Sequence, residues 1–198
     1  MAQLLMPAGL QAYFDKGIQA FSQGCYDYAV DLLAYVVKQA PQATEARRYL
    51  RLAIQKQYSV QPPSLFEHLG RAGLTWFLQW FAGAFELQGR MAQATHLYEW
   101  LLTLTPRSRI LLLRLASVLN RQGLIDSAIQ TYEELLAIDP NHVVALRRLS
   151  NLSMKQGDDP KARRCLERIL QLHPGDVEAQ QNLRNLDALG TIKKGFTT

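Results

Sequence analysis

The sequence predicts an all-α fold, a solenoid of antiparallel helix hairpins that ends in a C-terminal capping helix. Three observations support this prediction. Prolines recur every 34 residues, at Pro106, Pro140 and Pro174. A glycine and an alanine keep fixed offsets ahead of each of these prolines. Between them, apolar residues recur at spacings of three and four, which is the period of one face of an α-helix.

Four segments align on their closing prolines: Leu10–Pro41, Thr75–Pro106, Arg109–Pro140 and Val143–Pro174. Three columns of this alignment hold only small residues. They are Gly24, Gly89, Gly123 and Gly157; Ala29, Ala94, Ala128 and Ala162; and Gly17, Ala82, Ala116 and Ser150. The glycine follows the first apolar stripe, where a left-handed turn suits a residue without Cβ. The other two columns place small side chains where two helices cross closely, so each segment is predicted to be helix, turn, helix.

The ends of the predicted helices also have local signals. The closing proline cannot continue a helix, and it therefore ends each hairpin. Asp27, Asp126 and Asp159 lie shortly before the alanine column and are candidate N-caps of the second helices. Pro160 suits a first helical turn, where a missing N–H group is harmless.

The pattern resembles the tetratricopeptide repeat, a helix–turn–helix unit whose signature is this same period of 34 residues. The small residues, the alanine column, Tyr98 and Tyr132, and the closing prolines all fit. The resemblance is strongest over residues 75–174 and covers 10–41 as well. It implies a right-handed superhelix in which the first helix of each hairpin lines the concave side.

The period breaks once, and this break sets the predicted organisation. Residues 1–57 are predicted to form an N-terminal hairpin plus an extra helix, and 75–190 three hairpins plus the capping helix. Between them, residues 58–74 contain Pro62 and Pro63 and are either an irregular connection or a degenerate repeat. Residues 191–198 are expected to be a flexible tail.

Composition is that of a folded soluble protein, with 48% apolar and 20% charged residues and a net charge of +5. The two cysteines, Cys25 and Cys165, are too distant in sequence to indicate a disulfide framework, so we expect a reducing, cytoplasmic location. The N-terminus has no positively charged start and no sustained apolar run, so we expect no signal peptide. The longest apolar stretch, residues 72–85, is shorter than a membrane-spanning helix.

The sequence carries no recognisable catalytic or metal-binding motif. No two of its four histidines have the spacing of a metal site, and neither cysteine has a close partner. The glycines mark turns and form no phosphate-binding loop. We therefore expect no enzyme activity, no cofactor, no metal and no small-molecule substrate.

The predicted concave face nevertheless carries groups that could bind a peptide. Arg114, Arg147 and Arg148 could hold carboxylates, because a guanidinium can form two parallel hydrogen bonds. The same face carries amides, a further cation and two aromatic anchors: Asn151, Asn182, Lys155, Trp76 and Trp80. The alternative is that the arginines only solvate a polar face and the tryptophans pack under residues 58–74.

These features predict a non-catalytic scaffold that binds a peptide or protein segment, acidic in character and of unknown identity. Some tetratricopeptide proteins clamp a chaperone's C-terminal carboxylate, but only Arg147, Asn151 and Asn182 resemble that clamp, so we do not expect this activity. A second hypothesis is self-association as a homodimer through the apolar residues 72–85. A third is RNA binding, which the modest net charge does not favour.

Overall fold

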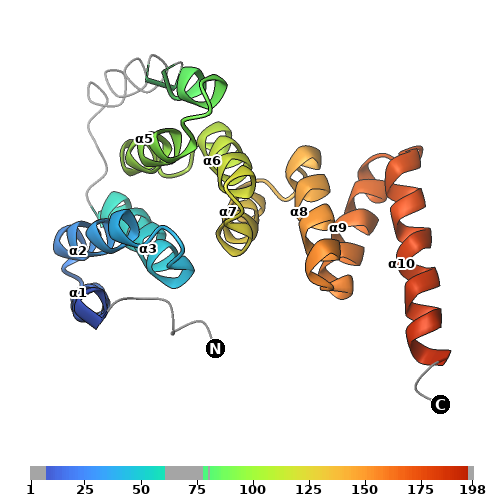
Figure 1. The fold of residues 1–198 in the computed structure, drawn as a ribbon, viewed down its shortest axis with the longest axis horizontal. Coiled ribbons are helices and arrows are strands. Elements are labelled where there is room, and N and C mark those ends of the chain that lie inside the picture. Colours follow the sequence, from blue (N-terminus) through green and yellow to red (C-terminus); the bar gives the residue numbers. More distant parts are fainter. Residues whose placement is uncertain (1–7, 61–77, 80, 196–198) are drawn as a thin grey trace. The chain divides into compact units, whose positions relative to one another are not determined.

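A computed structural model of the chain describes residues 8–60, 78–79 and 81–195. All regular secondary structure within these ranges is helical, as the sequence predicts (Figure 1). The chain divides into two compact units, Met1–Ala128 and Ile129–Thr198. None of the helices in the described ranges is long and apolar enough to cross a membrane.

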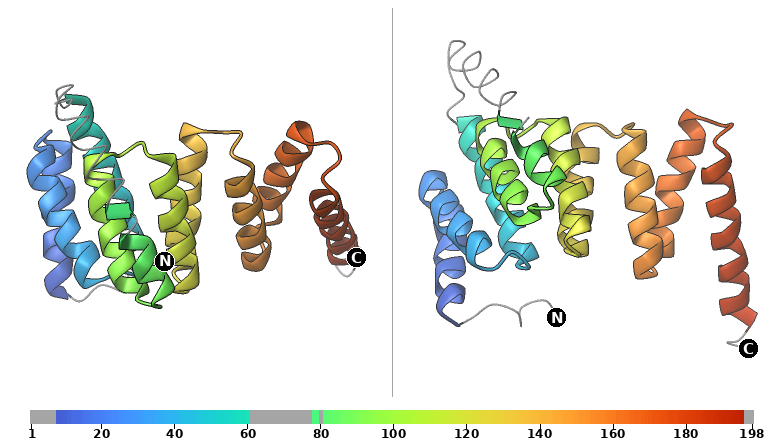
Figure 2. Two further views of the ribbon diagram at one scale, coloured as in Figure 1. Left: turned by 90° about the horizontal axis from the view of Figure 1, so that it is seen from above. Right: turned by 45° about the horizontal axis from the view of Figure 1, so that its top comes forward.

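The first unit contains most of the helices. In chain order these are α1 (Ala8–Ser22), α2 (Tyr26–Gln39), α3 (Thr44–Val60), helical residues 81–87, α5 (Met91–Leu104), α6 (Arg109–Arg121) and the start of α7 (Ile125–Ile138). Helix α2 packs against both α1 and α3 (Figures 1 and 2). Their shared core includes Phe14 of α1, Leu33 of α2 and Leu50 of α3, because apolar residues recur at spacings of three and four within each of these helices.

The second unit contains the rest of α7, then α8 (Val143–Gln156), α9 (Asp159–Leu172) and α10 (Val177–Gly195). Helix α9 packs against α8 on one side and α10 on the other (Figure 2). Helix α10 buries Ala179 and Leu186 in the position predicted for a capping helix. It continues through residue 195, so residues 191–195, predicted as part of a flexible tail, are helical.

The three small-residue columns have the roles that the sequence predicts. The four turn glycines have φ angles of 74–79°, in the left-handed region where a Cβ atom is strained. All four residues of the alanine column are fully buried. A Cβ atom added to Gly17 would lie 2.9 Å from the side chain of Leu33, so the close helix crossing at this position requires glycine.

The prolines end the hairpins as predicted, but the N-cap prediction is wrong. Helices α2, α5, α7 and α9 each end two residues before the closing proline. Asp27, Asp126 and Asp159 lie within the first turns and are not N-caps, because each helix begins two residues after its turn glycine. In α9 the cap is Asp158, which accepts a hydrogen bond from the N–H of Lys161 at 3.1 Å. The negative charges of these three aspartates still interact favourably with the positive end of the helix dipole.

The break in the period falls largely outside the described residues. Helix α3 runs to Val60, so residues 58–60, predicted as the start of the irregular segment, are helical. The rest of 58–74 lies outside the described residues, as do residues 72–77 and 80 of the apolar stretch 72–85. The domain boundaries drawn there therefore stay predictions.

Candidate functional site

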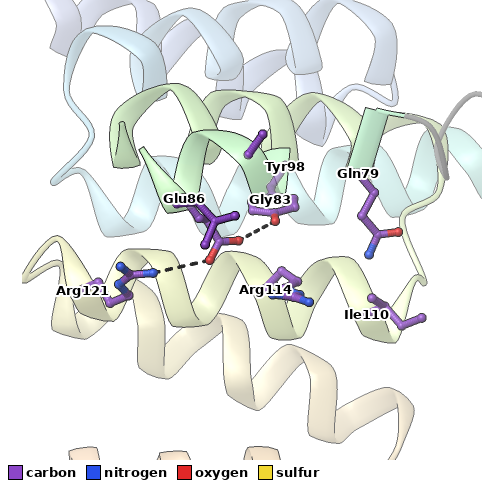
Figure 3. Close-up of a pocket in the computed structure, with 9 residues that line it drawn as sticks. Gln79, Gly83, Glu86, Tyr98, Ile110, Arg114 and Arg121 are labelled. Carbon is purple, nitrogen blue, oxygen red and sulfur yellow. Dashed lines mark hydrogen bonds and ion pairs between the residues drawn. The ribbon is translucent and has the colours of Figure 1, made fainter. Parts of the chain in front are cut away.

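A groove in the first unit combines apolar and charged groups. It has a volume of about 740 Å³ and lies between residues 79–87, α5 and α6. Its lining includes Gln79, Gly83, Glu86, Leu87, Tyr98, Ile110, Arg114 and Arg121. The helical repeat explains this composition, since Ile110, Arg114 and Arg121 recur on one face of α6 at spacings of four and seven (Figure 3).

Glu86 places a negative charge in this groove, and two contacts hold its side chain in position. Its carboxylate accepts a hydrogen bond of 2.5 Å from the hydroxyl of Tyr98 and lies 3.5 Å from Nη1 of Arg121 (Figure 3). Burial and the hydrogen bond to Glu86 raise the pKa of Tyr98 well above its usual value. The phenol therefore stays neutral and keeps donating to Glu86. Glu86 in turn engages Arg121, so that cation is already paired inside the protein.

Arg114 is the cation left available in the groove. Its side chain is exposed on α6 and forms no ion pair with any residue in the described ranges. Its positive charge partly opposes the rise in the pKa of Tyr98. Two exposed apolar side chains, Ile110 at 61% exposure and Leu87 at 92%, line the same groove. The groove thus offers a guanidinium beside apolar surface.

The second unit repeats the pairing of an arginine with a buried tyrosine. Arg148 and Tyr132 lie 34 residues after Arg114 and Tyr98. Tyr132 is 1% exposed, and burial raises the pKa of its phenol while the charge of Arg148 opposes that rise. Arg148 is exposed and has no ion-pair partner in the part of the chain that the structure describes. Equivalent repeat positions therefore present a second available cation.

Arg147 differs from its neighbour, because carboxylates of its own unit already occupy its guanidinium. Nη2 of Arg147 lies 2.5 Å from Oδ2 of Asp176, and Nη1 bonds the carboxylate of Glu178. Of the other predicted site residues, Lys155 is exposed and Asn151 and Asn182 are half-buried. Trp76 and Trp80 lie outside the described residues.

Comparison with known families identifies the repeat. Two family models, both described as tetratricopeptide repeat, match residues 84–143 and 119–186. Together they span more than half of the 198 residues. The chain is a tetratricopeptide repeat protein. Its N-terminal hairpin lies outside both matches. Even so, Gly24 has the left-handed backbone conformation of the other turn glycines, and Ala29 is fully buried like the rest of the alanine column.

Solved structures share this tetratricopeptide fold. The first tetratricopeptide domain of Spaghetti (RPAP3), bound to the HSP90 peptide SRMEEVD, is 20% identical, with TM-score 0.54, covering 59% of this chain and 93% of that one. The chaperone SycD of Yersinia enterocolitica, in complex with a YopD peptide, is 17% identical, with TM-score 0.52, covering 57% and 92%. MamA is 16% identical, with TM-score 0.51, covering 90% and 86%. At these identities the likeness shows the fold alone. No curated protein matches the sequence.

A buried ion cluster in this tetratricopeptide repeat protein was not predicted from the sequence. Arg47 and Arg51 of α3, 2% and 6% exposed, both bond the carboxylate of Glu99 in α5, at 2.8 and 2.6 Å. Arg47 also donates to the hydroxyl of Ser127. A signal was present: the two arginines lie four residues apart on the apolar stripe of α3 that includes Leu50. The cluster joins helices on either side of the break in the period.

The described residues contain no cluster of His, Cys, Asp or Glu that could hold a metal ion. One of the histidines, His142, caps α8 by accepting from the N–H of Ala145 at 3.2 Å. Cys165 is 6% exposed, and burial raises the pKa of its thiol to about 11. It therefore packs as a small apolar residue.

The two cysteines are expected to differ widely in reactivity. At pH 8 a thiol of pKa about 11 is ionised in only about one molecule per thousand, and only the thiolate reacts. Cys25 is exposed and should therefore react with iodoacetamide first. Because its pKa is raised, the labelling rate of Cys165 should grow about tenfold per pH unit between pH 8 and 10. Peptide mass spectrometry measures both rates, and equal labelling at pH 8 would contradict this burial.

Proposed function

We propose that this tetratricopeptide repeat protein is a non-catalytic scaffold that binds an acidic peptide or protein segment. The binding surface is the face shared by the first helices of the hairpins, the concave side in such arrays. The observation that carries the proposal is the groove in the first unit, where Arg114 lies without an ion-pair partner among the described residues, beside exposed Ile110 and Leu87.

The chemistry of this groove favours one class of ligand. A guanidinium holds a carboxylate through two parallel hydrogen bonds, and apolar surface around it excludes water and strengthens them. Ile110 and Leu87 offer that surface and a place for an apolar side chain. The ligand that fits is an extended segment in which Asp or Glu alternates with apolar residues. Arg148 offers the same group one repeat later.

Solved structures of the same fold support a peptide as the ligand. The Spaghetti domain holds an HSP90 peptide with three acidic residues, SRMEEVD, and SycD holds a YopD peptide. The chain departs from the chaperone clamp, because only Arg147, Asn151 and Asn182 match it and Arg147 is already paired. We therefore propose an acidic segment as the ligand, and not a C-terminal carboxylate as such.

Self-association is the second candidate function. Phe81, at 40% exposure, and Leu87, at 92%, leave apolar surface at and just after the end of residues 72–85. A second copy of the chain could cover this surface. Light scattering over a range of concentrations separates the candidates, because a concentration-independent monomer is incompatible with self-association.

Binding should depend on the available arginines. A library of random heptapeptides, panned against the protein, is expected to yield peptides enriched in Asp and Glu. The double variant Arg114→Glu/Arg148→Glu should bind the selected peptides at least about tenfold more weakly, since each reversal replaces attraction by repulsion. Fluorescence polarisation measures this change.

The matched control is Arg164→Glu, which reverses an exposed charge on α9, the second helix of its hairpin. It should leave binding close to that of the wild type. Peptides without acidic enrichment, or equal losses in all variants, would refute the proposed site.

A further inference from the structure

We propose that Glu178 is a built-in competitor for the acidic partner, occupying Arg147 until the partner displaces it. This inference rests on the proposed function and assigns its regulation to one residue. Within the second unit, a carboxylate of the partner would then bind first at Arg148, and Arg147 would contribute only after Glu178 leaves. Glu178 thereby limits affinity and helps to determine which acidic segments bind.

The geometry shows why Glu178 can act as a substitute ligand. Its carboxylate bonds Nη1 of Arg147, while Asp176 bonds Nη2. The Arg147 side chain is 35% exposed and that of Glu178 is 51% exposed. Both groups therefore lie where a partner could reach them. A carboxylate from another chain could take the place of Glu178 and make the same bond to the same nitrogen.

The two carboxylates on Arg147 have different roles. Oδ1 of Asp176 accepts a hydrogen bond of 2.9 Å from the N–H of Ala179 in the first turn of α10. This bond, together with the charge of Arg147, lowers the pKa of Asp176. Asp176 therefore caps α10 and orients the guanidinium. Within the described ranges, the only hydrogen bond of the Glu178 side chain is to Arg147, so its removal should leave the cap and the orientation intact.

The repeat pattern indicates that this pair is specific to one position. The residues aligned with Glu178 in the four hairpins are uncharged: Gln11, Trp76, Ile110 and Val144. Those aligned with Arg147 are also uncharged: Phe14, Gln79, Leu113 and Gln181. The hairpins fold without either charge at these positions, so the framework does not require the pair. The positive charge of Arg147 and the negative charge of Glu178 thus occur only where the two side chains form an ion pair with each other.

The ion pair between Glu178 and Arg147 is weak enough for a partner's carboxylate to displace Glu178. Exposed ion pairs are weak, because water solvates both ions and salt screens them. A partner already held at Arg148, the neighbouring arginine of the same unit, presents its carboxylate at a high effective concentration, and it can displace Glu178. Removing Glu178 should therefore tighten the binding of acidic peptides by about three- to tenfold.

The test uses the full chain and acidic heptapeptides selected by panning on the wild type and, separately, on Glu178→Gln. Glu178→Gln should bind them about three- to tenfold more tightly than the wild type. The gain should vanish when Arg147→Gln is combined with Glu178→Gln and compared with Arg147→Gln alone. The matched control is Glu167→Gln, which makes the same charge change at an exposed position of α9.

Each outcome separates the inference from the proposed function. Binding by the wild type that Glu178→Gln leaves unchanged overturns the inference and preserves the function. A gain that Glu167→Gln reproduces, or that persists without Arg147, also overturns it, because the effect is then one of net charge. Binding only after Glu178→Gln supports it. A failure of both proteins to bind or select acidic peptides overturns both. Melting curves verify that each variant is folded.

Discussion

Replacing Glu99 with glutamine is expected to lower the free energy of unfolding by about 3–5 kcal/mol, the usual cost of removing one partner of a buried ion pair. Glu99 is the shared carboxylate of two arginines, and its side chain is only 11% exposed. Glutamine keeps the shape but removes the negative charge. The guanidinium groups of Arg47 and Arg51 would stay buried and would repel each other without it.

Urea unfolding followed by circular dichroism measures this loss. The matched control is Glu45→Gln on α3, the helix of the two buried arginines, which removes a carboxylate 3.9 Å from Arg48. Both side chains of that pair are about half exposed, so the change should cost less than about 1 kcal/mol. Similar losses for the two variants would show that the cluster is solvated and contributes little.

The second large effect is expected at Leu115, which is fully buried in α6. Leu115→Ala should cost about 2–5 kcal/mol, because it removes apolar contacts and leaves a cavity that a close-packed core fills only partly. The position also matters for the repeat, since Leu115 precedes Ala116 of the small-residue column. The same unfolding measurement applies.

Ile110→Ala serves as the control because it deletes a side chain of similar size from the same helix. Ile110 is 61% exposed, so its loss should change stability by no more than about 0.5–1 kcal/mol. If the two variants unfold at the same urea concentration, the core of the first unit is not packed as described.

The fold could be predicted from the sequence because its signals are local and repeated. A left-handed turn favours glycine, a close helix crossing requires a small residue, and a proline ends a helix, so Gly157, Ala162 and Pro174 each report one local constraint. The helix starts were misplaced for the same reason. Aspartate is favoured both at the cap and in the first turn, and composition alone does not distinguish Asp158 from Asp159.

The charged contacts could not be predicted because they join residues far apart in the sequence. Arg47 and Glu99 are separated by 52 residues and by the break in the period, so no alignment of repeats pairs them. Arg147 and Arg148 are adjacent and identical in type, yet among the residues that the structure describes only Arg147 meets carboxylates of its own unit. Which arginine is available depends on the direction of each side chain, which a list of residues does not contain.

The recurring glycine and closing proline bear on how such a chain changes length in evolution. Because every hairpin turns and stops through its own residues, duplication or loss of one whole 34-residue segment joins ends that already match. Within a helix, an insertion of any other size would displace a buried alanine such as Ala128. Relatives of this protein should therefore differ in length by whole hairpins, and shorter insertions should fall between one proline and the next helix.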